Sequence, residues 1–170
     1  MRGVRLSKEL NGVSRVPKWI PTDEQVLRMF DATPPRYRAA LWLGAGEGLR
    51  VGEAHGVEEG KRCFGFEDEE LHVVQQLRYS PKEYGGFYLS KPKSGSSGTV
   101  DLDPVVAEHV QQHMRDFPPV EVPLIDITSG EQASRTALLL FTTSAREPVH
   151  RPDVGAGVRQ VASGGRLAGQ

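Results

Sequence analysis

The first half of the chain carries hydrophobic residues at helical spacing. Thr22 and Gln25 stand three residues apart in front of one apolar stripe, which is the arrangement of a capping box at the start of a helix. The Pro34-Pro35 pair is expected to end this helix. A second helix is predicted over residues 36–45, and it is expected to be buried because its middle is apolar on nearly every side. One further short turn is predicted at residues 51–55.

The middle of the chain alternates between apolar and polar residues, as a half-buried strand does. The apolar positions of this first predicted strand are Leu71, Val73, Leu77 and Tyr79. Two more short strands are predicted at residues 87–89 and 99–102. Between them, residues 91–98 are rich in lysine, glycine and serine and predict a mobile hairpin tip. Together these segments predict a small antiparallel sheet of three strands.

A last helix is predicted to start at Pro104, with Asp103 as its N-cap, and to stop before two consecutive prolines. Residues 121–136 are interpreted as a polar insert, whereas residues 138–141 form an apolar run that is expected to be buried. The whole pattern predicts an α+β fold that is mostly helical, with the three-stranded sheet as a minor part.

Length and composition suit one folded domain, with 170 residues of which 38% are hydrophobic and 25% are charged. Residues 1–18 are interpreted as a basic linker, residues 19–154 as the folded part, and the glycine-rich residues 155–170 as a disordered tail. The formal net charge of -1 gives no support to nucleic-acid binding, which usually depends on a basic excess.

Several classes of protein are excluded by what the sequence lacks. The single cysteine, Cys63, provides neither a disulfide framework nor a thiolate metal cluster. No apolar run is long enough to cross a bilayer and no signal peptide opens the chain, so a cytoplasmic protein without a membrane partner is expected.

Three familiar kinds of site are also disfavoured. The glycines of residues 44–48 lack the third glycine of a dinucleotide-binding loop, because Leu49 occupies that position. His109 and His113 stand four residues apart on a predicted helix, but no third metal ligand has a recognisable spacing, so a solvated helix face is favoured. The serines of residues 90–97 have no nucleophile elbow around them. Neither a metal nor a cofactor is therefore expected.

Two cations remain as candidates for phosphate chemistry. Arg50 follows the buried helix, and its guanidinium can make two parallel hydrogen bonds to a phosphate, with Glu53 on the same helical face to orient it. Lys93 lies in the glycine- and serine-rich segment and can donate a proton to a leaving oxygen or contact a phosphate. The alternative for Arg50 and Glu53 is an ordinary surface ion pair, and the alternative for Lys93 is a lysine that serves solubility.

Three segments together resemble the tyrosine recombinases, the family of the phage integrases. Residues 39–54 resemble the family's first-arginine box, in which a buried helix runs into a G-L-R-x-x-E turn. Residues 88–102 are similar to its lysine hairpin, and residues 140–143 to the L-F-T-T segment that precedes the second half of the active site. The resemblance covers about residues 17–154, so residues 19–154 would be the N-terminal part of an integrase-like catalytic domain.

The resemblance implies site-specific recombination or integration of a mobile genetic element through a phosphotyrosine intermediate, with double-stranded DNA as the partner and without metal or ATP. By matching position, Arg50 would be the first catalytic arginine, Glu53 its supporting carboxylate and Lys93 the general acid. Lys91 and Ser94, on either side of Lys93 in the sequence, would contact DNA.

The sequence also departs from the family pattern. Gly98 stands where the family has an arginine, no H-x-x-R box follows Phe141, and no tyrosine follows Tyr88. We therefore expect a truncated integrase that does not cleave DNA alone. Two alternatives stay open: a module without catalysis that binds DNA or an intact recombinase, and a small α+β protein unrelated to DNA.

Overall fold

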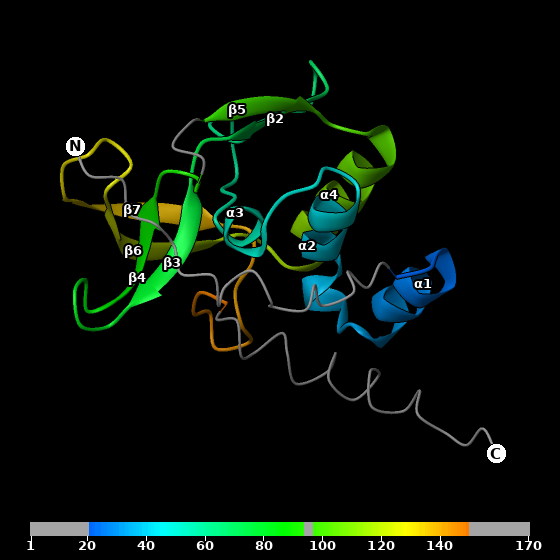
Figure 1. The fold of residues 1–170 in the computed structure, drawn as a ribbon, viewed down its shortest axis with the longest axis horizontal. Helices are drawn as coiled ribbons and strands as arrows, with labels where there is room; N and C mark the ends of the chain where they lie inside the picture. The colour runs from blue at the N-terminus through cyan, green and yellow to red at the C-terminus, as the bar shows by residue number, and fades with distance from the viewer. Residues whose placement is uncertain (1–20, 94–96, 150–170) are drawn as a thin grey trace, which may run out of the picture.

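The computed structural model describes residues 21–93 and 97–149. The predicted basic linker, the predicted glycine-rich tail and Ser94 lie outside these residues. The helices are α1 (Asp23–Ala32), α2 (Pro35–Ala45), α3 (Val51–His55) and α4 (Pro104–Asp116). The strands are β1 (Phe64–Gly65), β2 (Glu70–Val73), β3 (Gln76–Ser80), β4 (Gly86–Ser90), β5 (Gly98–Asp101), β6 (Val120–Asp126) and β7 (Ala133–Leu139). Figure 1 shows α1, α2 and α4 gathered on one side and the β3, β4, β6 and β7 strands on the other.

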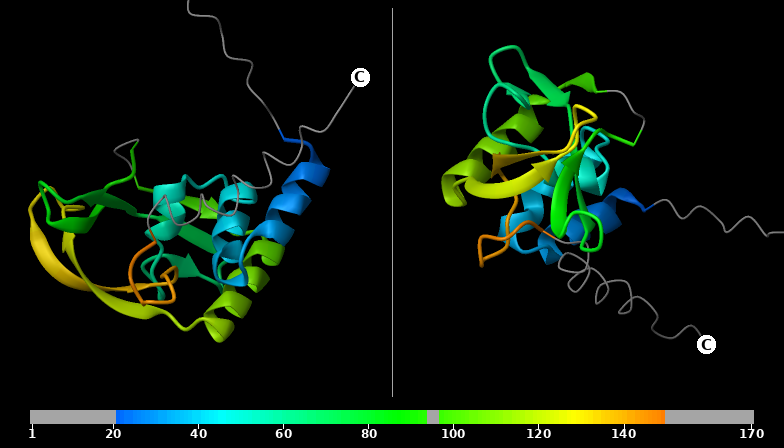
Figure 2. Two further views of the ribbon diagram at one scale, coloured as in Figure 1. Left: turned by 90° about the horizontal axis from the view of Figure 1, so that it is seen from below. Right: turned by 90° about the vertical axis from the view of Figure 1, so that its left-hand side faces the viewer.

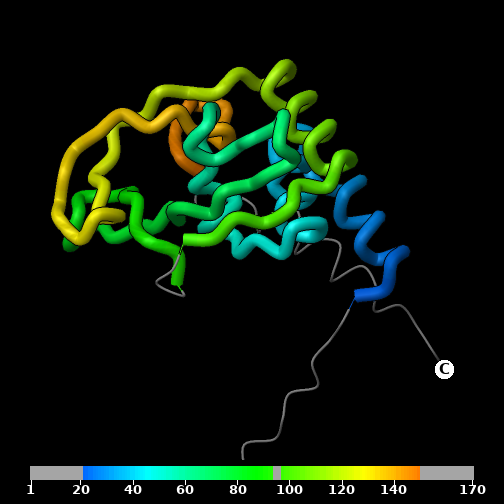
Figure 3. The backbone as a smooth tube through the Cα atoms, turned by 90° about the horizontal axis from the view of Figure 1, so that it is seen from above, coloured from blue at the N-terminus to red at the C-terminus, as the bar shows by residue number. Residues whose placement is uncertain are grey.

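The helical side is built around α2 and α4, which pack against the three-stranded antiparallel sheet β1-β2-β5. Leu43 of α2, Leu71 of β2 and Val110 of α4 are fully buried in this core. The predicted apolar run closes it, because Leu140 and Phe141 return from the far side of the molecule and pack into the same cluster. Figure 3 shows this return as the orange segment that follows β7.

The second side is a four-stranded sheet of order β3-β4-β6-β7 with its own smaller core, which includes Leu77, Leu89 and Leu139. β3 and β4 form one antiparallel hairpin and β6 and β7 another, and the two hairpins meet in a short parallel pairing of β4 with β6. The views in Figure 2 show this sheet at the end of the molecule away from α1. α3 packs against both α2 and β3 and therefore lies between the two sides.

The expectation of a mostly helical fold with one small sheet is wrong. Helix accounts for 31% of the described residues and strand for 29%, in two sheets. The segment interpreted as a polar insert contributes two seven-residue strands, β6 and β7. Along β6, buried Val120, Val122 and Leu124 alternate with exposed Glu121 and Pro123, which is the two-residue period of a sheet with one covered face.

The predicted strand over residues 71–79 is two strands in two different sheets, β2 and β3, divided at Val74 and Gln75. The glycine- and serine-rich segment is consequently not a hairpin tip. It connects β4 of the four-stranded sheet with β5, which pairs with β2 in the three-stranded sheet. No helix among the described residues is long and apolar enough to span a membrane.

Candidate functional site

Arg50 is fixed at the start of α3 by a buried carboxylate. Glu53 accepts a hydrogen bond from the Arg50 backbone N–H at 2.9 Å and another from Arg50 Nη1 at 3.0 Å. Only 6% of the Glu53 side chain is exposed, whereas 61% of the Arg50 side chain is exposed. Within the described part of the chain, the guanidinium has no other partner. The predicted pair is thus more than a surface ion pair, and it leaves an oriented guanidinium facing solvent.

The backbone of α3 is held against β3 by two glycines. A Cβ atom at Gly56 would lie 2.8 Å from the backbone nitrogen of Leu77, and one at Gly52 would lie 3.0 Å from the carbonyl oxygen of the same residue. Helix and strand can approach each other this closely only because glycine has no side chain at these two positions. Burial also lowers the pKa of the neighbouring His55 to about 4, so this imidazole is neutral at pH 7. The position of Arg50 therefore follows from the position of β3.

The lysine segment begins at the end of β4, the strand that pairs with β3. Gln76 of β3 pairs with Ser90 of β4, and Lys91 and Lys93 follow directly with exposed side chains. The side-chain amide of Gln76 donates a hydrogen bond of 2.5 Å to the Lys91 carbonyl oxygen. A Cβ atom at Gly52 would lie 3.6 Å from Gln76 Oε1. The arginine helix and the lysine segment thus both border Gln76.

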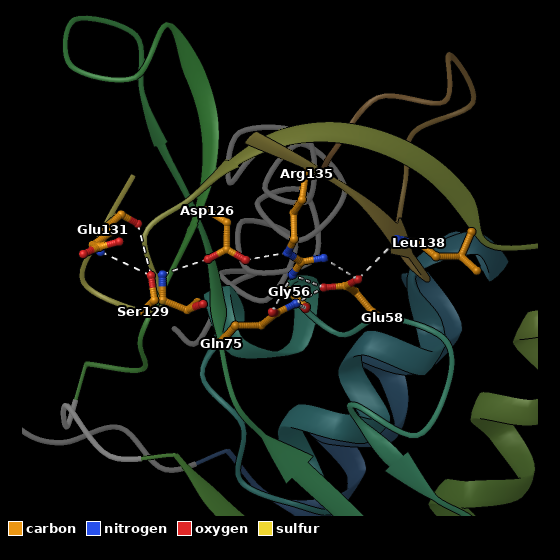
Figure 4. Close-up of polar contacts among 9 residues, drawn as sticks. Gly56, Glu58, Gln75, Asp126, Ser129, Glu131, Arg135 and Leu138 are labelled. Carbon is orange, nitrogen blue, oxygen red and sulfur yellow. Dashed lines mark hydrogen bonds and ion pairs between the residues drawn. The ribbon is translucent and has the colours of Figure 1, made fainter. Parts of the chain in front are cut away.

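A buried polar cluster around Arg135 joins α3 to the four-stranded sheet (Figure 4). Arg135 donates to both oxygens of Glu58, at 2.8 and 2.5 Å, to Gln75 Oε1 at 2.9 Å, and to the carboxylate of Asp126. The amide of Gln75 donates in turn to the Gly56 carbonyl oxygen at 2.7 Å, next to the end of α3. Glu58, Gln75 and Asp126 are all buried.

Arg135 keeps both carboxylates of the cluster ionised. Burial alone would raise the pKa of Glu58, but hydrogen bonds from Arg135 and Gln75 hold it below its usual value. Burial likewise opposes ionisation of Asp126, whose pKa is nevertheless lowered by hydrogen bonds from Arg135 and Thr128. The hydrogen bonds of Glu58 raise the pKa of Arg135. Since the guanidinium is committed to these internal acceptors, Arg135 serves the structure and is not a phosphate ligand.

The sequence did not reveal this cluster. Glu58 and Arg135 stand 77 positions apart, and each is a charged residue of a type usually found at the surface. The only available signal was the alternation of β6, which would have placed Asp126 on the buried face with Val122 and Leu124.

The expectation that His109 and His113 form a solvated helix face is wrong for His113. This residue is buried, and its Nε2 lies 3.1 Å from the Leu140 carbonyl oxygen, to which it donates. His109 stacks on Trp42 with ring centroids 4.3 Å apart. His113 is thus buried in the helical side, whereas His109 is exposed and lies against Trp42. Among the described residues, no group of three histidine, cysteine or acidic side chains is placed to hold a metal ion.

No protein-family model matches the chain, and no curated protein matches it in sequence. Solved structures do match. One structure of the Tn1549 transposon integrase in complex with transposon right-end DNA superposes with a TM-score of 0.68 at 20% identity, covering 91% of this chain and 48% of the integrase chain. The chain is similar in fold to a transposon integrase. A second integrase structure, in complex with a circular-intermediate DNA, gives a TM-score of 0.69 at 20% identity with the same coverage.

A third structure of the Tn1549 integrase, with another circular-intermediate DNA, gives a TM-score of 0.68 and 20% identity over 91% of this chain. The chain spans about half the length of the integrase chains that it matches. These neighbours support the resemblance to integrases at the level of the fold. The roles assigned to Arg50, Glu53, Lys91, Ser94 and Lys93 remain predictions.

Proposed function

We propose that residues 21–149 form the phosphate-binding half of an integrase-type catalytic domain and bind double-stranded DNA in a process of site-specific recombination. The observation that carries this proposal is the exposed guanidinium of Arg50, held from behind by buried Glu53, in a fold similar to that of a DNA-bound integrase. A guanidinium with free donors in a fixed direction is suited to two parallel hydrogen bonds with a phosphate.

Lys91 and Lys93 extend the same surface. Both are exposed, and both follow the β4 strand at the point where Gln76 and α3 meet. In the proposed complex, Arg50 binds the non-bridging oxygens of one phosphate, and Lys93 reaches the bridging oxygen or a neighbouring phosphate. Lys91, and Ser94 outside the described residues, contact the DNA backbone nearby.

The same assignment predicts binding without cleavage for these 170 residues by themselves. The family resemblance makes Arg50 the first arginine and Lys93 the general acid, but the 170 residues contain no tyrosine after Tyr88. The covalent phosphotyrosine route requires that nucleophile. The missing H-x-x-R arginine would cost a further factor on the order of a hundred in rate, as the loss of one transition-state donor does.

The test is duplex DNA affinity measured by fluorescence anisotropy between about 50 and about 200 mM salt. Arg50→Ala and Lys93→Ala should each weaken binding and lower the slope of log affinity against log salt by about one. Arg28→Ala is the matched control for Arg50, because Arg28 is 62% exposed and also pairs with a helical glutamate. Lys82→Ala is the control for Lys93, since Lys82 is an exposed lysine in the turn between β3 and β4.

Equal affinities and equal salt slopes for the wild-type protein, Arg50→Ala and Lys93→Ala would contradict the proposal. The same holds if the Arg28→Ala and Lys82→Ala controls lower the slope as much as the site variants, because binding would then depend on total charge alone. A gel assay with supercoiled and nicked substrates tests cleavage, and any covalent protein–DNA product would refute the second part.

A further inference from the structure

Gln76 borders both parts of the proposed site. Its backbone lies against α3, where a Cβ atom at Gly56 would come within 3.0 Å of the Gln76 Cα and carbonyl carbon atoms. Its side-chain amide donates to the Lys91 carbonyl oxygen at 2.5 Å. We propose that Gln76 is a positioning residue that holds the Lys91–Lys93 segment at a fixed place relative to Arg50. This inference rests on the proposed function for its consequence in DNA binding.

The backbone of Gln76 is well fixed on both sides. On one side, α3 reaches β3 through Gly52 and Gly56 with no side chain between them. On the other side, Gln76 is paired with Ser90 in the β3–β4 ladder. The side chain of Gln76 therefore projects from a rigid point, and its amide can transmit the position of α3 to whatever it binds.

The acceptor of this amide is well placed to control the lysines. Lys91 is followed by the buried residue Pro92. The proline ring fixes the φ angle of Pro92 and restricts the preceding Lys91 to an extended backbone. The Lys91 carbonyl oxygen also accepts a weaker hydrogen bond of 3.3 Å from Ser90 Oγ. Because the Lys91 carbonyl oxygen is anchored and Pro92 is rigid, the direction of the backbone is fixed as far as Lys93. Without the Gln76 amide, the Lys91 carbonyl oxygen keeps the weaker hydrogen bond from Ser90 Oγ.

The experiment is a double-mutant cycle on DNA affinity. Lys93→Ala is introduced into the wild-type protein and into Gln76→Ala and Gln76→Glu, of which the second has nearly the same shape but no N–H to donate when ionised. We expect Lys93→Ala to lower the salt slope by about one in the wild type and by about half of that or less in both Gln76 backgrounds. Arg50→Ala should lower the salt slope equally in all backgrounds, because Arg50 is held by Glu53 and not by Gln76.

Gln112→Ala is the matched control, because Gln112 on α4 also donates its amide to a single exposed acceptor, Asp116. In this background the effect of Lys93→Ala should equal that in the wild type. An undiminished Lys93→Ala effect in the Gln76 variants would overturn the positioning role, and so would an equal loss in Gln112→Ala.

A second measurement separates this inference from the proposed function. The ¹⁵N heteronuclear NOE of the Lys91 and Lys93 amides should fall in Gln76→Ala and stay unchanged in Gln112→Ala, with no DNA present. If Lys93→Ala has no effect on affinity in the wild type, the proposed function fails, while a fallen NOE still supports positioning. If the NOE values do not change in Gln76→Ala, the positioning role is refuted whatever the DNA affinities are.

Discussion

Replacement of Arg135 by methionine should strongly destabilise the fold. Arg135 is the shared donor of two carboxylates, and Glu58 and Asp126 are only 6% and 7% exposed. Methionine keeps most of the apolar stem and removes the guanidinium. The loss of one partner from a buried ion pair typically costs 3–5 kcal/mol, because the remaining charge is left uncompensated. A domain of this size has a total stability of about 5–15 kcal/mol.

The pH dependence of this loss follows from the two carboxyl groups. In the wild type, the folded pKa values of Glu58 and Asp126 are below their unfolded values of 4.5 and 3.8, so their stabilisation is present above those values and lost as the pH falls through the folded ones. In Arg135→Met, the guanidinium no longer opposes the effect of burial, and both pKa values should rise. The destabilisation by Arg135→Met should therefore be largest near pH 7 and shrink towards pH 4.

The assay is urea unfolding of the wild type, Arg135→Met and the control Arg28→Met at several pH values, followed by far-ultraviolet circular dichroism. Arg28 forms an exposed helical pair with Glu24, so its replacement should cost at most about 0.5 kcal/mol. A loss below about 1 kcal/mol for Arg135→Met at pH 7, or a loss that is the same at pH 7 and pH 4, would refute the reasoning.

Three further predictions concern α3. Gly56→Ala should lower the unfolding free energy by about 1–3 kcal/mol in urea titrations, since its Cβ would meet the β3 backbone at 2.8 Å, and an unchanged midpoint would show that the helix can shift freely. His55, with a folded pKa of about 4 against 6.5 unfolded, should contribute an acid-induced loss of about 3 kcal/mol as the pH falls from 6.5 to 4; thermal melts of His55→Gln should lack this component. Glu53→Gln should weaken duplex binding by less than Arg50→Ala does, because the amide can still accept one of the two hydrogen bonds; anisotropy titrations that show a larger loss would contradict this order.

The helices were the predictable part of the fold, because their signals are local. The capping box of Thr22 and Gln25 is present, with both reciprocal hydrogen bonds. Asp103 caps α4 through the Val105 backbone N–H, and Pro104 opens the helix as expected. The short turn at residues 51–55 is α3. In each case the residues that decide the structure stand within four positions of one another.

The sheets were less predictable, because strand pairing is decided by distant residues. Apolar residues keep an even spacing on both sides of the change of sheet, at Val73 and Leu77, and only Gln75 interrupts the series between them. Two-residue periodicity reports which face of a strand is covered, and it does not report which strand lies beside it. The polar residues of β7 similarly favoured an insert over a strand, because the partners that leave the Arg135 side chain only 25% exposed are distant in the sequence.

Two adjacent glutamines, Gln75 just before β3 and Gln76 as its first residue, separate stability from site geometry. Gln75 is 2% exposed and donates to the Gly56 carbonyl oxygen, whereas Gln76 is half-buried and donates to that of Lys91. Gln75→Leu leaves the buried Gly56 carbonyl without its side-chain donor and removes one hydrogen bond each from Arg135 and Glu58, so it should cost about 1–3 kcal/mol in urea unfolding.

Gln76→Ala breaks a hydrogen bond near solvent, and its cost should stay at about 0.5–1.5 kcal/mol. Water can replace the lost donor at the Lys91 carbonyl, whereas the carbonyl that Gln75 serves is out of its reach. Neighbouring residues with the same side chain should thus give different results: loss of stability for Gln75, and loss of the Lys93 contribution to DNA binding for Gln76. If both variants lose the same stability, the partition between the Arg135 cluster and the lysine segment is wrong, and β3 responds as one unit.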